Sequence, residues 1–153
     1  MSADETERPT YDPPRRIRQL PSWLTAEVAR KASSLVAEAL AADGVRRQHF
    51  AVLTSLSEQG AASQAALGRR LWIDRSDLNG ILNDLEQAGL AARIPDTEDR
   101  RRNLVELTPK GTRTLMRLDK RIDTAQDRLL EPLSPAERRQ LSELLKRVLQ
   151  YQG

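Results

Sequence analysis

Residues Asp74 to Thr108, DRSDLNGILNDLEQAGLAARIPDTEDRRRNLVELT, carry the most informative pattern of the chain. Aspartate caps helix N-termini well, and the residues after Asp74 place apolar side chains on one helical face, at Leu78, Ile81, Leu82 and Leu85. Gly89 ends this helix, because glycine readily adopts the left-handed backbone that closes helices. Two short apolar runs, residues 90–94 and 103–107, then flank a polar segment. The stretch therefore predicts an amphipathic helix followed directly by a β-hairpin.

Helical patterns also precede and follow this stretch. Three helices are predicted upstream, over residues 22–42 (capped by Ser22 or Thr25), 46–58 and 64–71 (capped by Ser63). Downstream, Thr108-Pro109 opens a long helix, because proline fits the first helical position. The segment Ser134-Pro135-Ala136-Glu137 is a capping box that opens a last helix. Both downstream helices carry apolar residues at spacings of three and four, which predicts one apolar face on each.

The predicted helices over residues 46–58 and 64–71, the helix after Asp74 and the hairpin together form a winged helix-turn-helix, in which the hairpin is the wing. The predicted fold class is mainly α (α+β winged helix), with six helices and a two-stranded wing. We expect a flexible N-terminal arm and one domain, divided as follows: arm 1–21, domain 22–153, winged helix 45–107, dimerisation helices 22–43 and 108–151. Dimerisation is expected because the apolar faces of the long helices need a partner to cover them.

The composition excludes several classes of function. The chain has 153 residues, of which 39% are hydrophobic, with no cysteine and one histidine. Disulfides, thiol nucleophiles and clusters of thiolate or histidine metal ligands are therefore excluded, and we expect no metal, no cofactor and no enzyme activity. No apolar run has the length of a membrane span, and the polar N-terminus does not resemble a secretory signal. The expectation is a soluble cytoplasmic protein.

The predicted helix after Asp74 is the candidate for reading DNA. In a helix-turn-helix the second helix enters the major groove with its N-terminal residues at the base edges. Opposite the apolar stripe this helix presents Arg75, Ser76, Asn79, Gly80 and Asn83. Arginine pairs with guanine and asparagine with adenine, while a glycine lets the backbone approach DNA closely. The alternative interpretation is an ordinary solvent-exposed helix face.

The predicted hairpin turn carries three consecutive arginines, Arg100, Arg101 and Arg102. One of them could enter the minor groove, where narrow A·T tracts concentrate negative potential. The alternative is a charged turn, because three acidic residues of the same turn balance the arginines. Since the turn directly follows the candidate reading helix, the two features together favour DNA binding.

These residues resemble a known signature. Asp99-Arg100-Arg101, five further residues and then Leu107-Thr108 match the wing signature of the MarR family, the multiple-antibiotic-resistance regulators. Residues 74–90 are similar to that family's recognition helix and its exit into the wing, and the resemblance covers residues 22–150. Gly80 departs from the pattern, since many members carry a longer polar or basic residue there, so base preferences do not transfer.

The resemblance implies a two-fold symmetric homodimer, joined by the first and the last two helices, that binds double-stranded DNA across adjacent major grooves. By the same resemblance, Arg101 would enter the minor groove, held by Asp99 through a charge-assisted hydrogen bond. Ser63 and Gln64 would contact the DNA backbone. The arginines of the arm, within residues 15–18, would add phosphate contacts, or the arm would pack against the partner subunit.

The resemblance also implies a cleft for a small aromatic or anionic ligand between the dimerisation helices and the DNA-binding part. Candidate lining residues are Trp23, His49, Phe50 and Trp72. The alternative is that these aromatic side chains fill the core and that His49 is a partly buried structural residue. Without cysteine, the thiol-based peroxide sensing of some family members is excluded.

The expected function is that of a homodimeric transcriptional regulator, a repressor that reads a pseudo-palindromic operator and is released by a small ligand. Three alternatives stay open: an architectural protein that binds DNA without sequence preference, a winged-helix protein-interaction module, and a small enzyme. Regulators typically bind their sites at least ~10³ times more tightly than random DNA, so this ratio distinguishes a regulator from an architectural protein. The sequence offers no paired catalytic residues for the third.

Overall fold

The structure of the chain is a computed structural model that describes residues 11–99 and 101–151. Within these ranges it has seven helices and three short strands: α1 (Arg15–Arg18), α2 (Pro21–Ala41), α3 (Arg47–Gln59), β1 (Ala62–Ser63), α4 (Gln64–Leu71), α5 (Arg75–Gln87), β2 (Ala91–Pro95), β3 (Asn103–Leu107), α6 (Pro109–Leu129) and α7 (Pro135–Gln150). The predicted fold class, mainly α with a winged helix, is confirmed.

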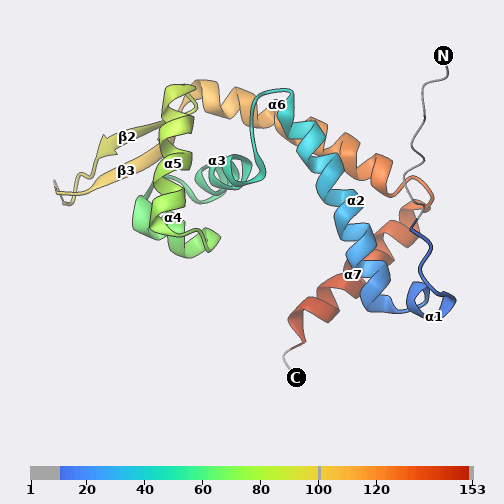
Figure 1. Cartoon of the computed structure of the whole chain (residues 1–153). Helices are drawn as coiled ribbons and strands as arrows, with labels where there is room; N and C mark the ends of the chain where they lie inside the picture. Colours follow the sequence, from blue (N-terminus) through green and yellow to red (C-terminus); the bar gives the residue numbers. More distant parts are fainter. Residues whose placement is uncertain (1–10, 100, 152–153) are drawn as a thin grey trace, which may run out of the picture.

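The elements form two parts that the long helix α6 joins (Figure 1). One part is a compact lobe of α3, α4, α5 and the sheet, from which the β2–β3 hairpin projects. The other part contains α1, α2 and α7, which lie toward the opposite end of α6. Helix α2 packs against α6. The hairpin and helix α7 therefore lie at opposite ends of the molecule.

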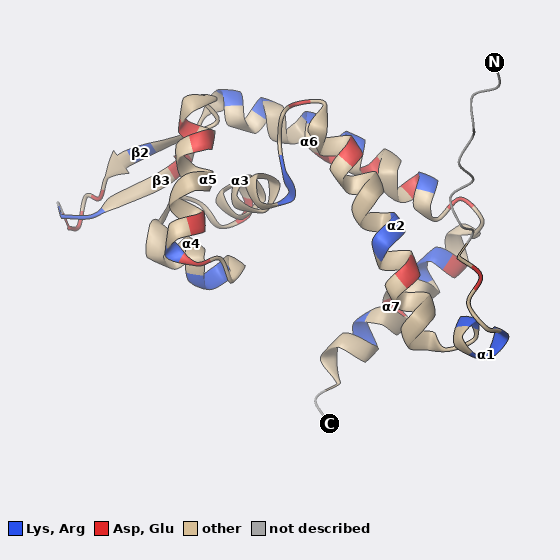
Figure 2. Cartoon of the chain, viewed as in Figure 1, with Lys and Arg blue, Asp and Glu red and all other residues tan. Residues whose placement is uncertain are grey.

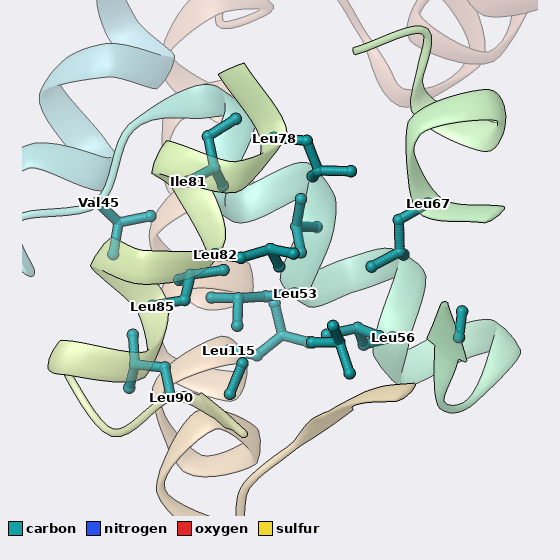
Figure 3. Packing of buried hydrophobic residues seen from close by; sticks show 14 of the residues in the cluster. Val45, Leu53, Leu56, Leu67, Leu78, Ile81, Leu82, Leu85, Leu90 and Leu115 are labelled. Carbon is teal, nitrogen blue, oxygen red and sulfur yellow. The ribbon is translucent and has the colours of Figure 1, made fainter. Parts of the chain in front are cut away.

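Leucines from several helices form the core of the lobe (Figure 3). Leu53 of α3 and Leu118 of α6 are fully buried, and all four residues of the stripe predicted on α5 are buried: Leu78, Ile81, Leu82 and Leu85. Full burial of one such side chain stabilises the fold by about 1.5–3 kcal/mol. The core therefore fixes α5 with one face inward and leaves the opposite face free for other contacts.

The sheet has the strand order β1–β3–β2, and both pairings are antiparallel. The β2–β3 hairpin runs from the pair Ala91–Leu107 to the pair Pro95–Asn103, as the sequence predicts. Strand β1 is an addition to the predicted two-stranded wing, because two residues are too short to show a period. It forms by pairing with β3, and this pairing places Ser63 and the start of α4 beside the wing.

Most predicted helix starts are confirmed. The predicted caps accept a backbone N–H at the first turn of α4, α5, α6 and α7: Ser63, Asp74, Thr108 and Ser134. The last of them forms the complete capping box with Glu137.

The predicted cap of the first long helix is wrong. Helix α2 begins at Pro21 with Leu20 at the cap position, so neither Ser22 nor Thr25 caps it, and the Thr25 hydroxyl donates to the carbonyl of Pro21 at 2.7 Å. Proline at the first position lacks the N–H that a cap would satisfy, which explains the shift. The count of six helices is also exceeded, because the four-residue helix α1 lies within the predicted arm and is too short to show a period.

Apolar side chains remain exposed on the outer helices of a single chain. Helix α7 has no buried residue, and the exposed apolar residues of α2 and α7 are Leu24, Val28, Leu144, Leu145, Val148 and Leu149. These exposed apolar residues of α2 and α7 are below called the outer apolar face. None of the described helices combines the length and the apolar character of a membrane span.

Candidate nucleic-acid interface

Asp74 caps the N-terminus of α5. The carboxylate of Asp74 accepts hydrogen bonds from the backbone N–H groups of Ser76 at 2.8 Å and Asp77 at 2.9 Å. The backbone hydrogen bond from Asp77 lowers the pKa of Asp74, and the adjacent Asp74 carboxylate raises the pKa of Asp77. Asp74 therefore stays ionised at neutral pH, which suits its place at the N-terminus of α5.

The exposed face of α5 is the one that the sequence predicts. Its five candidate residues are all exposed: Arg75, Ser76, Asn79, Gly80 and Asn83. A Cβ atom at Gly80 would meet no other heavy atom within 4 Å, so packing within the chain does not require glycine at this position. The absence of a side chain is consistent with close approach of a ligand to the helix backbone.

A depression of about 480 Å³ lies between α4, α5 and the wing. Five arginines line it: Arg69, Arg75, Arg93, Arg101 and Arg102. Ser63 and Gln64 also line it, and no acidic residue is among the described residues of its wall. The structure thus brings together residues predicted separately, at the start of α4, on α5 and on the wing, around one strongly cationic surface, called below the arginine depression.

Three polar residues of the arginine depression were not predicted as site residues: Arg69, Arg93 and Asn103. Arg69 and Arg70 form a pair of arginines at the end of α4, which is a signal of a basic surface in the sequence. The position of Arg69 beside the wing depends on tertiary packing. Arg93 and Asn103 lie on β2 and β3, where period and charge did not distinguish them. Figure 2 shows the basic segments at the end of α4 and near the tip of the wing.

The start of α4 contributes two predicted residues. The hydroxyl of Ser63 accepts the N–H of Ala66 at 3.2 Å, so it caps α4 in the structure. Gln64 lies directly beside α5, and its Nε2 donates to the carbonyl of Arg75 at 3.5 Å. Both residues border the arginine depression, and the four N-terminal N–H groups of α4 give this edge a positive end of a helix dipole.

The wing turn is organised by Asp99. Its carboxylate accepts the backbone N–H of Arg101 at 3.0 Å, and its other oxygen lies 3.4 Å from Nε of Arg102. The expected anchoring of Arg101 therefore acts on the backbone of that residue, and its side chain remains exposed. Arg100, also predicted as a site residue, lies outside the described residues.

His49 is a buried structural residue, one of the two interpretations that the sequence leaves open. It is 5% exposed. Its Nδ1 accepts the backbone N–H of Arg46 at 3.1 Å and therefore carries no proton, so Nε2 donates to Asp84 at 3.0 Å. The guanidinium of Arg46 reaches the same Asp84 oxygen at 3.0 Å. His49 thus ties the start of α3 to the middle of α5.

The other candidate ligand residues do not gather around His49. Trp72 follows α4 with a left-handed backbone (φ 54°) and is 96% exposed, so the interpretation that it fills the core is wrong. Trp23 is partly exposed near the start of α2, and Phe50 packs against the core. None of the depressions described on this structure is lined by Trp23, His49, Phe50 or Trp72.

The arginines of the arm lie far from the arginine depression. Helix α1 sits beside α2 at the end of the molecule opposite to the wing (Figure 1). Arg18 forms an exposed ion pair with Asp12 at 3.3 Å. Within one chain this position favours the second of the two interpretations, in which the arm packs against a subunit rather than on the same DNA surface.

These features define a winged-helix protein with a cationic face that is suited to duplex DNA. The MarR family model matches residues 45–102. The chain is 31% identical over 98 residues to the HTH-type transcriptional regulator FarR of Neisseria gonorrhoeae, covering 64% of this chain and 67% of FarR. It is 37% identical over 76 residues to the transcriptional activatory protein BadR of Rhodopseudomonas palustris, covering 48% of this chain and 43% of BadR.

Solved structures agree. A mutant MarR from E. coli, complexed with operator DNA, matches with a TM-score of 0.72 and 27% sequence identity, covering 84% of this chain and 92% of that chain. The chain belongs to the MarR family. The aligned part spans less than half the length of BadR. The relatives are regulators of transcription, in agreement with the expectation that this protein is not an enzyme.

Proposed function

We propose that this chain is a cytoplasmic, homodimeric DNA-binding regulator of transcription, a repressor that occupies a pseudo-palindromic operator. The arginine depression is the observation that carries the proposal. It joins the N-terminal end of α4, Arg75 at the start of α5 and the wing into one surface with five arginines. DNA affinity depends on the phosphate backbone, and arginine forms paired hydrogen bonds with phosphate and with guanine.

The contacts divide between positioning and reading. Arg69, Arg102 and the start of α4 would contact phosphates, which set the register of the protein on the duplex. Arg75, Asn79 and Asn83 would face base edges in the major groove. Arg101, on the turn that Asp99 organises, would enter the minor groove. The domain division proposed from the sequence gives residues 45–107 this task.

A second copy of this chain would cover the outer apolar face. These residues stay exposed in a single chain, in which no residue of α7 is buried. A two-fold dimer would place two α5 helices for adjacent major grooves, with half-site centres about 10 bp apart. Such a dimer occupying a promoter would exclude RNA polymerase, which is why we propose repression.

Ligand-dependent release belongs to the same proposal. A small depression of about 270 Å³ between α2 and α6 is lined by Arg121, Arg128 and Glu38, and Glu38 lies 3.4 Å from Arg128. A small aromatic carboxylate would bind there by replacing Glu38 as the partner of Arg128. The depression lies on the helices that lead into the DNA-binding lobe, so an occupant could change the angle of that lobe. Benzoate should raise the melting temperature of the wild type and not of Arg121→Ala. An equal shift in both would place any site elsewhere.

Selection of bound fragments from random DNA is the test of the function. We expect one enriched pseudo-palindrome, bound at least ~10³ times more tightly than scrambled DNA. A ratio near one would support an architectural protein instead. Arg75→Ala and Arg101→Ala should both weaken binding, whereas a protein-interaction module would tolerate both substitutions. A reporter gene behind the selected site then tells repression from activation.

A further inference from the structure

Arg93 turns back from the wing onto the reading face of α5. Its Nη1 donates to Oδ1 of Asn83 at 3.4 Å, and its Nη2 donates to Oδ1 of Asn79 at 3.4 Å and of Asn83 at 3.5 Å. Nη1 also forms an ion pair with Glu86, one turn further along α5. The side chains of Arg93 and Glu86 are 27% and 30% exposed. A single partly buried guanidinium therefore touches both asparagines that face outward from α5.

The chemistry of guanidinium fixes how these two amides are oriented. Arginine has only N–H donors, so the amide atom that faces Arg93 must be the oxygen. The NH₂ groups of Asn79 and Asn83 therefore point away from Arg93, toward the solvent side of the helix. The Asn79 oxygen accepts one hydrogen bond from Arg93 and keeps a second lone pair, whereas the Asn83 oxygen accepts from both Nη1 and Nη2. Asn79 therefore combines an outward donor with a remaining acceptor, and Asn83 presents its NH₂ donor.

We propose that Arg93 is a positioning residue for base recognition, which sets the orientation of the Asn79 and Asn83 amides before DNA binds. The proposal rests on the proposed function, in which these asparagines read bases. Glu86 holds the guanidinium in place from the side of α5, and β2 holds it from the side of the wing. The wing therefore contributes to reading in the major groove without touching a base there.

A fixed amide makes a definite selection. An outward NH₂ group donates to N7 of a purine, O6 of guanine or O4 of thymine. Cytosine offers only an amino donor in the major groove, so it has no acceptor for this NH₂ group. An amide released from Arg93 can turn by half a rotation and accept that amino group. Loss of Arg93 should therefore increase tolerance of cytosine at the positions that the two asparagines contact.

Two other roles for Arg93 predict different results. If Arg93 only tied the wing to α5, lysine would replace it without a change in site preference, because lysine keeps the ion pair with Glu86. As a phosphate contact, its loss would weaken binding evenly across sequences. Arg93→Lys separates the first role, because one ammonium group cannot fork onto both amides. Arg93→Met separates the second, with Arg102→Met as the matched control that removes one charge from the same depression.

The experiment compares site preferences of the full-length variants, selected from random DNA, with those of Asn79→Ala and Asn83→Ala. At the positions that the asparagine variants also relax, Arg93→Lys and Arg93→Met should discriminate against cytosine about fivefold less well, or worse. Fivefold corresponds to the smallest discrimination expected of a bidentate base contact. Arg102→Met should weaken binding evenly. A wild-type profile for Arg93→Lys, or an even loss for Arg93→Met, would overturn the proposal.

A second measurement needs no DNA. The side-chain NH₂ signals of Asn79 and Asn83 in ¹⁵N-labelled protein should shift in Arg93→Lys, and unmoved signals would also overturn the proposal. Arg93→Lys retains a cation for Glu86, so it gives a folded comparison if Arg93→Met unfolds. A wild type that selects no site would contradict the proposed function, while the NH₂ signals would still test the orientation of the amides.

Discussion

Replacement of Asp99 by alanine separates anchoring of the wing from simple electrostatics. Asp99 is an acidic residue on a surface proposed to face DNA, so a purely coulombic argument predicts tighter binding after its removal. The structure gives it the opposite role, because its carboxylate accepts the N–H of Arg101 at 3.0 Å and lies 3.4 Å from Arg102. Asp99→Ala should release the turn that presents Arg101.

The contacts allow the two effects to be weighed. A hydrogen bond to a charged group contributes about 1.5–3 kcal/mol, and this exposed turn belongs at the lower end of that range. The exposed pair with Arg102 adds about 0–1 kcal/mol. A carboxylate roughly 9 Å from a phosphate repels it by about 0.5 kcal/mol in water, before screening by salt. The net expectation is a loss of about 1 kcal/mol, about fivefold in affinity.

Fluorescence anisotropy with the selected operator, over a series of salt concentrations, measures this balance. The loss in Asp99→Ala should grow with salt, because salt screens the repulsion and leaves the missing hydrogen bond. Asp99→Asn is the matched control: its amide oxygen can still accept the N–H of Arg101 while the charge is gone, so it should bind more tightly than the wild type at low salt. If Asp99→Ala binds more tightly than the wild type at every salt concentration, the turn is only a charged loop.

Three further predictions follow from the fold and the interface. Arg75→Ala should cost about 1–3 kcal/mol on the best operator and relax base preference at one symmetric pair of positions, measured by binding to operator variants. The protein should sediment at about twice the 17.2 kDa chain mass, and Leu145→Asp, on the outer apolar face, should shift it toward the monomer; a monomeric wild type would contradict the dimer. Gly111→Ala should destabilise the fold by about 1–3 kcal/mol, because a Cβ would overlap the carbonyl oxygen of Leu90. Gly80→Ala has free space for its Cβ and should stabilise α5 by up to about 1 kcal/mol. Equal denaturant midpoints for the two variants would refute this account of packing.

Features set by local chemistry were predictable from the sequence. The stripe on α5 has the helical period, and all four of its residues are buried as predicted. Asp74, Ser63 and Ser134 act as caps because their side chains reach N–H groups only two or three residues away. Helix α2 begins at Pro21 with Leu20 at the cap position and no side-chain acceptor, so a start signalled by serine or threonine was predicted too late. Local signals thus determine where helices begin, except where proline removes the need for a cap.

Features that depend on contacts distant in sequence were not predictable. Strand β1 exists only because Ala62 lies opposite Val105, and nothing within two residues signals that pairing. Trp72 is exposed although its size favours burial, because it follows the last turn of α4 in a left-handed conformation that directs the chain into α5. Arg93 looks like an ordinary polar residue of a strand until the hairpin folds back over α5. The sequence therefore predicted candidate residues on both elements of the site, but not Arg69 or Asn103, and not Arg93, which joins the two elements.

The proposed reading helix is oriented by polar groups that lie beside its exposed face. The buried leucines fix which face of α5 points into the lobe, and directional polar contacts add to this non-directional apolar packing. Hydrogen bonds are directional, and two sets of them act on α5: His49 and Arg46 bind Asp84, and Arg93 binds Glu86. Asp84 connects to α3 and Glu86 to the wing, so a displacement of either neighbour would rotate the exposed face. These polar ties therefore connect the exposed face of α5 both to α3 and to the wing.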